Sequence, residues 1–406
     1  MGTGPTNPGS RAIAGVATST TAFVGRTRQG PTDAPVVVTS VGEFERQFGG
    51  LWAEAPLGYS VRHYFENGGR RALICRIDPG DGHDLTDAAV SDPSLEADRR
   101  GLWMLDRADA VNVIVIPPLQ VGVDVGRQTW DAAVTYADRR GAMLIIDPPA
   151  AWAGPADVTP VAVDALVTPR EELANAALYV PRIRAADPLD PSGEGTFAPG
   201  GAVAGVWART DEQHGVWKSP AGRGASLVGV TGLTATLSDH DNGPLNARGI
   251  NALRSFPSLG HVVWGARTLR GADALASEWK YVAVRRTALF LEASIERGTE
   301  WAVFEPNDEP LWAQLRGHIA DFLVGMWRQG AFPGRTPRDA FFAKCDASTT
   351  TRTDIDDGRL NILVGFAPLK PAEFVLVRIQ LKMSPVPPAR RRTVRRAARR
   401  PRSRRA

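Results

Sequence analysis

Cysteine is scarce in this chain of 406 residues, which contains only Cys75 and Cys345. The two lie far apart in the sequence, and neither belongs to a spacing typical of a zinc site or a redox motif. We therefore expect two unpaired thiols in a reducing compartment. This scarcity argues against a disulfide-rich secreted scaffold and against a metal centre built on cysteine.

Long hydrophobic runs are also absent. No stretch approaches the roughly 18 uninterrupted apolar residues that a membrane-spanning helix needs. Residues 1–8 lack the charged and apolar regions of a signal peptide, so the expected location is the cytoplasm. The composition, 43% hydrophobic and 23% charged, is ordinary for a soluble protein, and the length allows a sizeable core divided into two or three domains.

The chain has only five lysines, and none of them follows a glycine. The phosphate-binding loop of a nucleotidase, which ends in Gly-Lys-Ser/Thr, is therefore missing. Asp147 ends an apolar run, as the metal-binding aspartate of an ATPase does, but without that loop it is better interpreted as the end of a strand. Gly222-Arg223-Gly224 begins like a dinucleotide fingerprint, yet Leu227 stands where the third glycine is needed.

Other catalytic signatures are missing too. The chain has no Gly-x-Ser-x-Gly elbow, and its six histidines show no zinc-ligand spacing. Asp239-His240-Asp241 is best explained as a solvated loop, and residues 354–358 resemble a calcium loop whose glycine comes one residue early. We expect no catalysis, cofactor, metal or small-molecule substrate; an α/β enzyme with a degenerate site near Asp147 is a rival interpretation, which requires a deep polar pocket there.

Positive charge is concentrated at the end of the chain. Ten arginines and no acidic residue lie between Arg390 and Arg405, and without these ten the formal net charge changes from +4 to −6. Residues 384–406 cannot form a core and are expected to be disordered. Two interpretations stay open: a basic arm that binds nucleic acid or an anionic membrane by charge alone, or the product of a shifted reading frame in a GC-rich gene.

The predicted fold class is α/β, an α+β core domain with an inserted α/β domain. The insertion is indicated by two apolar runs, 111–116 and 142–147, with a helix over 130–140 between them. The expected units are an extended arm, the first part of the core, an outer inserted domain, a C-terminal core domain and a disordered tail: residues 1–20, 21–99, 100–200, 201–383 and 384–406.

Two helices and a strand are predicted near the C-terminus. Ser277 caps the first helix, and Gly298 ends it. The second begins at Asn307 or Asp308, with Pro310 in its first turn, and Gly330 closes it. In the strand 374–382, Val377, Ile379 and Leu381 alternate with polar residues, which indicates one exposed face.

Five strings in one order carry a resemblance to a known family. They are VWGARTL at 263–269, EWKYV at 278–282, WAVFEPN at 301–307, DIDDGRLN at 354–361 and VGFAPLKPAEF at 364–374. Together they resemble the tail sheath proteins of contractile phage tails and of phage-tail-like injection systems. The run from Gly15 to Trp52 is similar to the start of the same family, so the resemblance fails only in the last two dozen residues.

The resemblance implies a subunit that polymerises as stacked hexameric rings around an inner tube. Contraction from a metastable extended state would drive the tube through a target envelope without ATP. The implied partners are other copies of the chain, an inner tube protein, and baseplate and terminator or cap proteins, in a virion tail or a cell-made device. The alternative is a structural DNA-associated protein that acts through the Arg-rich tail.

In this family the terminal segments of different subunits are interwoven with the C-terminal domain of a third. The resemblance therefore implies strand exchange between subunits, with the candidates Ala12, Ile13, Val16, Phe23, Phe374, Val375, Val377, Ile379 and Leu381. The face that grips the tube is left open. The candidates on the polar side of the 308–329 helix are Gln314, Arg316, Asp321 and Arg328.

Overall fold

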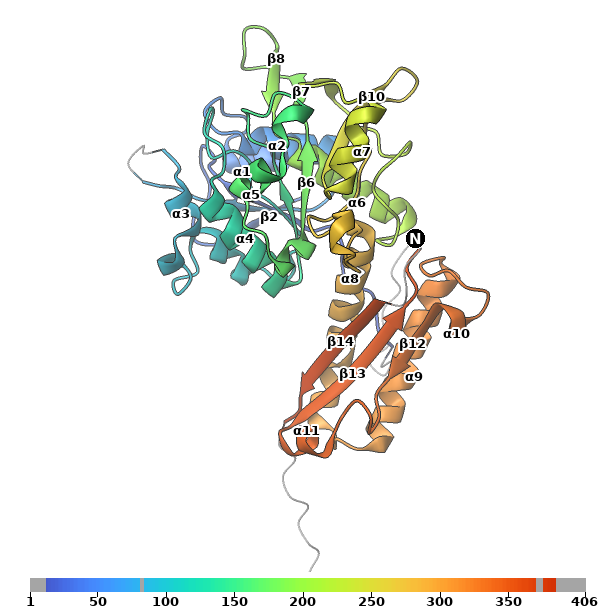
Figure 1. Cartoon of the computed structure of the whole chain (residues 1–406). Coiled ribbons are helices and arrows are strands. Elements are labelled where there is room, and N and C mark those ends of the chain that lie inside the picture. The colour runs from blue at the N-terminus through green and yellow to red at the C-terminus, as the bar shows by residue number, and fades with distance from the viewer. Residues whose placement is uncertain (1–11, 81–83, 370–374, 385–406) are drawn as a thin grey trace, which may run out of the picture.

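The computed structural model describes residues 12–80, 84–369 and 375–384. Figure 1 shows two parts joined at a narrow waist, a larger body (residues 19–281) and a smaller C-terminal domain. One long helix, α8 (Val282–Thr299), runs from the body into the C-terminal domain. No helix within these described residues combines the length and the hydrophobicity that crossing a bilayer requires.

The body is built on an eight-stranded sheet in the order β11-β10-β6-β5-β4-β1-β3-β2. The six central strands are parallel, whereas β2 and β11 pair antiparallel at the two edges. The bounds are β1 Thr21–Gly25, β2 Val36–Val38, β3 Ala72–Arg76, β4 Val113–Val115, β5 Met143–Ile146, β6 Ala176–Val180, β10 Asn251–Phe256 and β11 Gly260–Val263. The buried central strands read as apolar runs because helices cover both faces of the sheet.

Each face of this sheet has its own set of helices. On one face lie the body helices α3 Asp87–Ser91, α4 Arg127–Arg140, α5 Pro160–Leu166 and α7 Asp239–Ala247, with the 3-10 helix η2 Gly101–Arg107. On the other lie α1 Val41–Phe48, α2 Leu57–Glu66 and α6 Gly200–His214. A small sheet, β8-β7-β9, borders the body with strands Glu194–Phe197, Ile183–Ala186 and Val230–Leu233.

The predicted strand–helix–strand unit is confirmed, but the predicted domain boundaries do not separate sheets. Strand β1 lies between β3 and β4, which come from opposite sides of residue 100. Strands β10 and β11, beyond residue 201, join the same sheet. The reason is that parallel neighbours need crossover connections, so segments distant in sequence become adjacent in space.

The C-terminal domain is a three-stranded antiparallel sheet, β12-β13-β14, packed on α8 and α9. Its elements are η6 Glu300–Phe304, α9 Glu309–Arg328, α10 Pro337–Ala340, β12 Phe341–Lys344, α11 Arg352–Asp356, β13 Arg359–Phe366 and β14 Val375–Lys382. The predicted start of α9 is confirmed, because the Asp308 side chain accepts from the Leu311 N–H and Pro310 lies in the first turn.

The predicted ends of α8 are wrong at both sides. The helix begins at Val282 rather than after Ser277, because Tyr281 forms a β-bridge with Arg267 just before it. It also continues through Gly298 to Thr299. Gly298 is a packing position, since a Cβ there would lie 2.8 Å from Cγ1 of Ile13.

Helices α2 and α6 approach each other closely through glycines. A Cβ on Gly201 would lie 2.1 Å from the Ser60 carbonyl oxygen, and one on Gly205 would lie 2.4 Å from that of Tyr64. Real Cβ atoms do not come so near a backbone oxygen, so α6 can take this position only with glycines on that face.

We predict that Gly205→Ala lowers the free energy of unfolding by about 1–3 kcal/mol, because the methyl group forces α2 and α6 apart. The matched control is Gly325→Ala in α9, where a Cβ would meet no atom within 4 Å. It should raise stability by about 0.5–1 kcal/mol through helix propensity. Denaturant unfolding of both variants measures this, and equal effects would refute the packing argument.

Candidate interaction site

The C-terminal sheet has one buried face and one open face. Along β14, Val375, Val377, Ile379 and Leu381 are buried against α8 and α9. The intervening Leu376, Arg378, Gln380 and Lys382 are exposed. Among the described residues, no other strand pairs with the outer edges of β12 and β14. Unpaired main-chain groups along such edges can accept a strand from another chain.

Cations and apolar side chains share the open face. The register places Leu363 of β13 between Lys344 of β12 and Arg378 of β14. One step along, the Phe342 ring lies over Gly365, where a Cβ would be 2.2 Å from the ring, and Gly365 faces Leu376 on its other side. This combination suits a protein partner with acidic groups around an apolar centre better than a small molecule.

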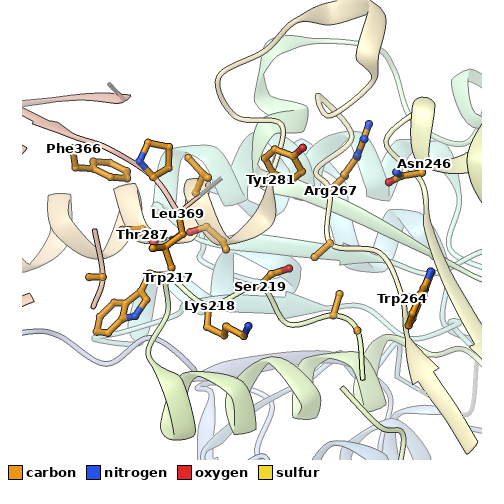
Figure 2. Close-up of a pocket in the computed structure, with 17 residues that line it drawn as sticks. Trp217, Lys218, Ser219, Asn246, Trp264, Arg267, Tyr281, Thr287, Phe366 and Leu369 are labelled. Atoms are coloured by element: carbon orange, nitrogen blue, oxygen red, sulfur yellow. Dashed lines mark hydrogen bonds between the residues drawn. The ribbon is translucent and has the colours of Figure 1, made fainter. Parts of the chain in front are cut away.

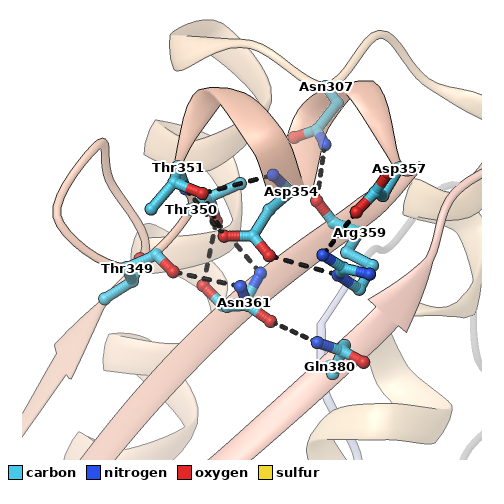
Figure 3. Close-up of polar contacts among 9 residues, drawn as sticks. All are labelled: Asn307, Thr349, Thr350, Thr351, Asp354, Asp357, Arg359, Asn361 and Gln380. Atoms are coloured by element: carbon cyan, nitrogen blue, oxygen red, sulfur yellow. Dashed lines mark hydrogen bonds and ion pairs between the residues drawn. The ribbon is translucent and has the colours of Figure 1, made fainter.

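A polar cluster fixes the far end of this sheet (Figure 3). The Asp354 carboxylate accepts from the Thr351 N–H at 3.0 Å and from Arg359 Nε at 3.1 Å. Arg359 also donates to Asp357 at 2.6 Å. The side chain of Asn361 accepts from Gln380 at 2.8 Å, which ties β13 to β14. The DIDDGRLN string therefore forms the end of α11, a turn and the start of β13, and its carboxylates are engaged by the chain itself.

Open grooves border the waist on two sides. One, of about 630 Å³, lies beside the start of β14 and is lined by Arg139, Glu292 and Leu376 among others. The other, of about 500 Å³ (Figure 2), lies between the body and the C-terminal domain and contains Trp217, Tyr281 and Phe366. Its Arg267 is already engaged by the Gly271 carbonyl and by Asp273. The described residues form no cluster of three or more metal-ligating side chains.

Asp147, the candidate of the enzyme interpretation, lies in a filled region. Its Oδ1 accepts from the Gly200 N–H at 2.7 Å at the start of α6, and the residue is 5% exposed. A Cβ on Gly200 would lie only 2.8 Å from that oxygen, so the start of α6 packs directly against this carboxylate. Burial raises the pKa of Asp147 to about 7, although Arg182 and the Gly200 N–H lower it.

Phe23 is a wrong candidate for strand exchange. It is fully buried in β1, which is paired on both sides, and therefore has no free edge. Ile13 and Val16 contact α8 of their own chain. Ala12 and Ile13 both line a further groove, which α9 borders. The side chains of Val375, Val377, Ile379 and Leu381 belong to the domain core, whereas Phe374 lies outside the described residues.

The tube-facing candidates differ in their surroundings. Gln314, Asp321 and Arg328 are exposed on α9. Arg316 is half-buried and donates to the Cys345 carbonyl and to Glu309. Sequence reasoning missed a buried ion pair, Arg286 with Asp211, which joins α8 to α6. The two residues are far apart in the chain, and the available signal was an arginine inside an otherwise apolar helix face.

Both cysteines are unpaired, as predicted, and the structure places both in buried positions. Burial raises the pKa of Cys75 and of Cys345 to about 12, so both thiols are protonated at neutral pH and unreactive.

The two edges of the C-terminal sheet that no described strand covers are suited to pairing with a strand of another chain, an arrangement typical of structural, self-associating proteins. A family model, the phage tail sheath C-terminal domain, matches residues 276–382. The tail sheath protein of Vibrio phage KVP40 is 28% identical over 177 residues, 43% of this chain and 25% of the phage protein. That of Enterobacteria phage T4 is 28% identical over 156 residues, 38% of this chain and 22% of the phage protein.

Solved sheath structures match over nearly the whole chain. The contracted sheath of the PVC extracellular contractile injection system is 28% identical, with a TM-score of 0.68 over 92% of this chain and 95% of that one. The contracted helical sheath of the anti-feeding prophage is 25% identical, with a TM-score of 0.71 over 92% and 97%. The chain is thus similar to contractile tail sheath proteins in sequence and fold, and it spans about a quarter of the length of the two curated phage relatives.

We predict that Asp354→Asn lowers the melting temperature at pH 7, because the amide is uncharged and keeps only one of the two oxygens that accept from Thr351 and Arg359. Hydrogen bonds from Thr351 lower the pKa of Asp354 to about 2. Its stabilisation is therefore present above the unfolded pKa of about 4 and is lost as the pH falls through about 2. The control, Asp356→Asn, removes only an exposed pair with Arg352 at 3.6 Å. If Asp354→Asn lowered the melting temperature as much at pH 2 as at pH 7, the ionised carboxylate would not be the source of the stabilisation.

Asp147→Asn should stabilise the chain at pH 8 by on the order of 1–3 kcal/mol. The pKa of Asp147 is raised in the folded state. The stability that this carboxyl contributes is therefore fully present below about pH 4 and is lost as the pH rises through about 7. Asparagine stays neutral and keeps the acceptor for Gly200. Unfolding at pH 5 and pH 8 measures this, with the exposed Asp164→Asn as control; an unchanged pH dependence would show that Asp147 is not buried in this way.

Proposed function

We propose that this chain is the structural subunit of a contractile sheath, polymerised as stacked hexameric rings around an inner tube. The observation that carries the proposal is the match of 92% of the chain to contracted injection-system sheaths at 25–28% identity. In this proposal its partners are further copies of itself, a baseplate, an inner tube protein and terminator or cap proteins. The assembled particle is a virion tail or a cell-made device.

In such a sheath, the free energy that drives contraction is stored in the extended lattice of subunits. Copies must stay connected while the lattice shortens, and main-chain hydrogen bonds between strands suit this because they depend little on side chains. We assign this role to the free edges of β12 and β14, which belong to the segment that the family model matches. Stored strain in the extended lattice supplies the driving force, so the subunit needs no nucleotide site.

The inner tube would be contacted from α9. Gln314, Asp321 and Arg328 lie exposed along this helix. Arg316 is left out of the contact set because the chain itself engages its guanidinium. The three exposed side chains include both charge signs, which suits orientation of a polar partner more than strong attachment. A tube that must slide past the sheath requires that kind of contact.

The test is negative-stain electron microscopy of the purified chain and of a form that ends at Ser384. We expect hollow striated tubes, because sheath subunits carry their own lattice contacts. Tubes from the shorter form alone would identify residues 385–406 as an obstacle. Uniform small particles from both forms at high concentration would contradict the proposal. Salt-sensitive DNA binding by the full-length chain alone would then favour the DNA-associated alternative.

A further inference from the structure

Residues 12–18, named here the strap, run along one face of α8 from the body to the C-terminal domain. The helix residues beneath it are spaced by four, which places them on a single stripe: Arg286, Phe290, Ser294 and Gly298. Thr18 contacts the first of them and Ile13 the last, so the strap and the helix run in opposite directions. Both ends of the waist are therefore in contact with one short segment.

The body end of the strap is held by a buried ion pair. Arg286 donates to the two carboxylate oxygens of Asp211 at 2.8 and 2.6 Å, and the side chains are 3% and 5% exposed. The same guanidinium donates to the Thr18 carbonyl at 2.9 Å, and the Thr18 hydroxyl donates to Asp211 at 2.7 Å. The Trp207 ring lies 4.9 Å from the guanidinium. Thr18 thus completes a desolvated, bidentate pair, which is the strong form of such contacts.

The lower part of the strap is held by packing and one hydrogen bond. The Val16 N–H donates to Ser294 Oγ at 3.1 Å. Gly15 lies against the Phe290 ring, where a Cβ would be 2.7 Å from Cζ, and Ile13 lies against Gly298 and is 8% exposed. Ile13 shares the hydrophobic core of the C-terminal domain with Leu291 and Ile295.

The lengths show that the strap has no slack. Five residue steps from Ile13 to Thr18 span at most about 17 Å when fully extended. Twelve helical steps from Arg286 to Gly298 span about 18 Å. The strap is therefore a nearly straight segment that is held at both ends of the waist. Two open grooves, of about 500 and 630 Å³, lie on other sides of α8.

We propose that the strap is an intramolecular brace that fixes the angle between the body and the C-terminal domain, with Arg286 and Asp211 as its positioning residues. Bending α8 toward either groove would stretch the strap or break one of its anchors. This proposal concerns the single chain and holds whether or not the chain builds a sheath.

The test is a distance measurement by double electron–electron resonance on the unassembled, full-length chain. Spin labels at Val161→Cys in the body and Thr353→Cys in the C-terminal domain report the angle, since both positions are exposed. The native thiols are buried and do not label. Inserting Gly-Gly after Ala14 adds slack to the strap, and the matched control inserts Gly-Gly after Arg11, upstream of it.

We expect one narrow distance distribution for the parent and the control, and a distribution about twice as wide for the strap insertion. Equally narrow distributions in all three would show that α8 alone holds the angle and would overturn the proposal. Circular dichroism shows whether each insertion is folded.

A second measurement keeps the idea testable if the insertion fails to fold. Hydrogen exchange of the Val16 amide should accelerate about tenfold in Arg286→Lys, which keeps the charge but loses the bidentate pairing. The comparison is Arg297→Lys, an exposed arginine on the same helix. Equal exchange rates would show that the ion pair does not hold the strap. Tube formation enters neither readout, so failure of the sheath proposal would be seen separately.

Discussion

Helix α8 has to satisfy two hydrophobic cores at once, and the shape of the molecule depends on this constraint. Val282 and Leu289 belong to the core beneath the large sheet, whereas Leu291 and Ile295 belong to the core of the C-terminal domain. A helix that is apolar on two faces cannot be displaced from one core without disturbing the other. The position of the C-terminal sheet, and of the edges that it offers, follows from the direction of this one element.

The glycines and the buried ion pair also fix the positions of α6, α8 and the N-terminal segment. Gly298 lets Ile13 approach the helix, and Gly201 and Gly205 bring α6 against α2, which places Asp211 where Arg286 can reach it. A buried ion pair adds little net stability compared with apolar packing of the same volume, but its geometry is demanding. Its effect here is on position, because only one alignment of α6, α8 and the N-terminal segment satisfies all of its hydrogen bonds.

Local patterns predicted local elements well. The alternation of Val377, Ile379 and Leu381 with polar residues gave β14 its buried and exposed faces, and Asp308 with Pro310 located the start of α9. Long-range order was not readable in the same way. Phe23 sits in a short β-type run whose sequence contains no information on whether it lies at an edge or in the centre of a sheet. Gly298 resembled a helix terminator because the packing partner that explains it, Ile13, is nearly three hundred residues away.

The pairing of β14 with β13 inside one chain has an energetic consequence. If copies exchange this strand, each main-chain hydrogen bond lost within a chain is replaced by the same bond between chains, as in domain swapping. The eight-residue register, Arg359 with Lys382 through Phe366 with Val375, would be reproduced unchanged. Replacing these hydrogen bonds one for one changes the enthalpy little. The exchange could therefore link neighbouring subunits, but it would not favour an extended lattice over a contracted one. In the proposed sheath, that decision would fall to contacts made outside this sheet.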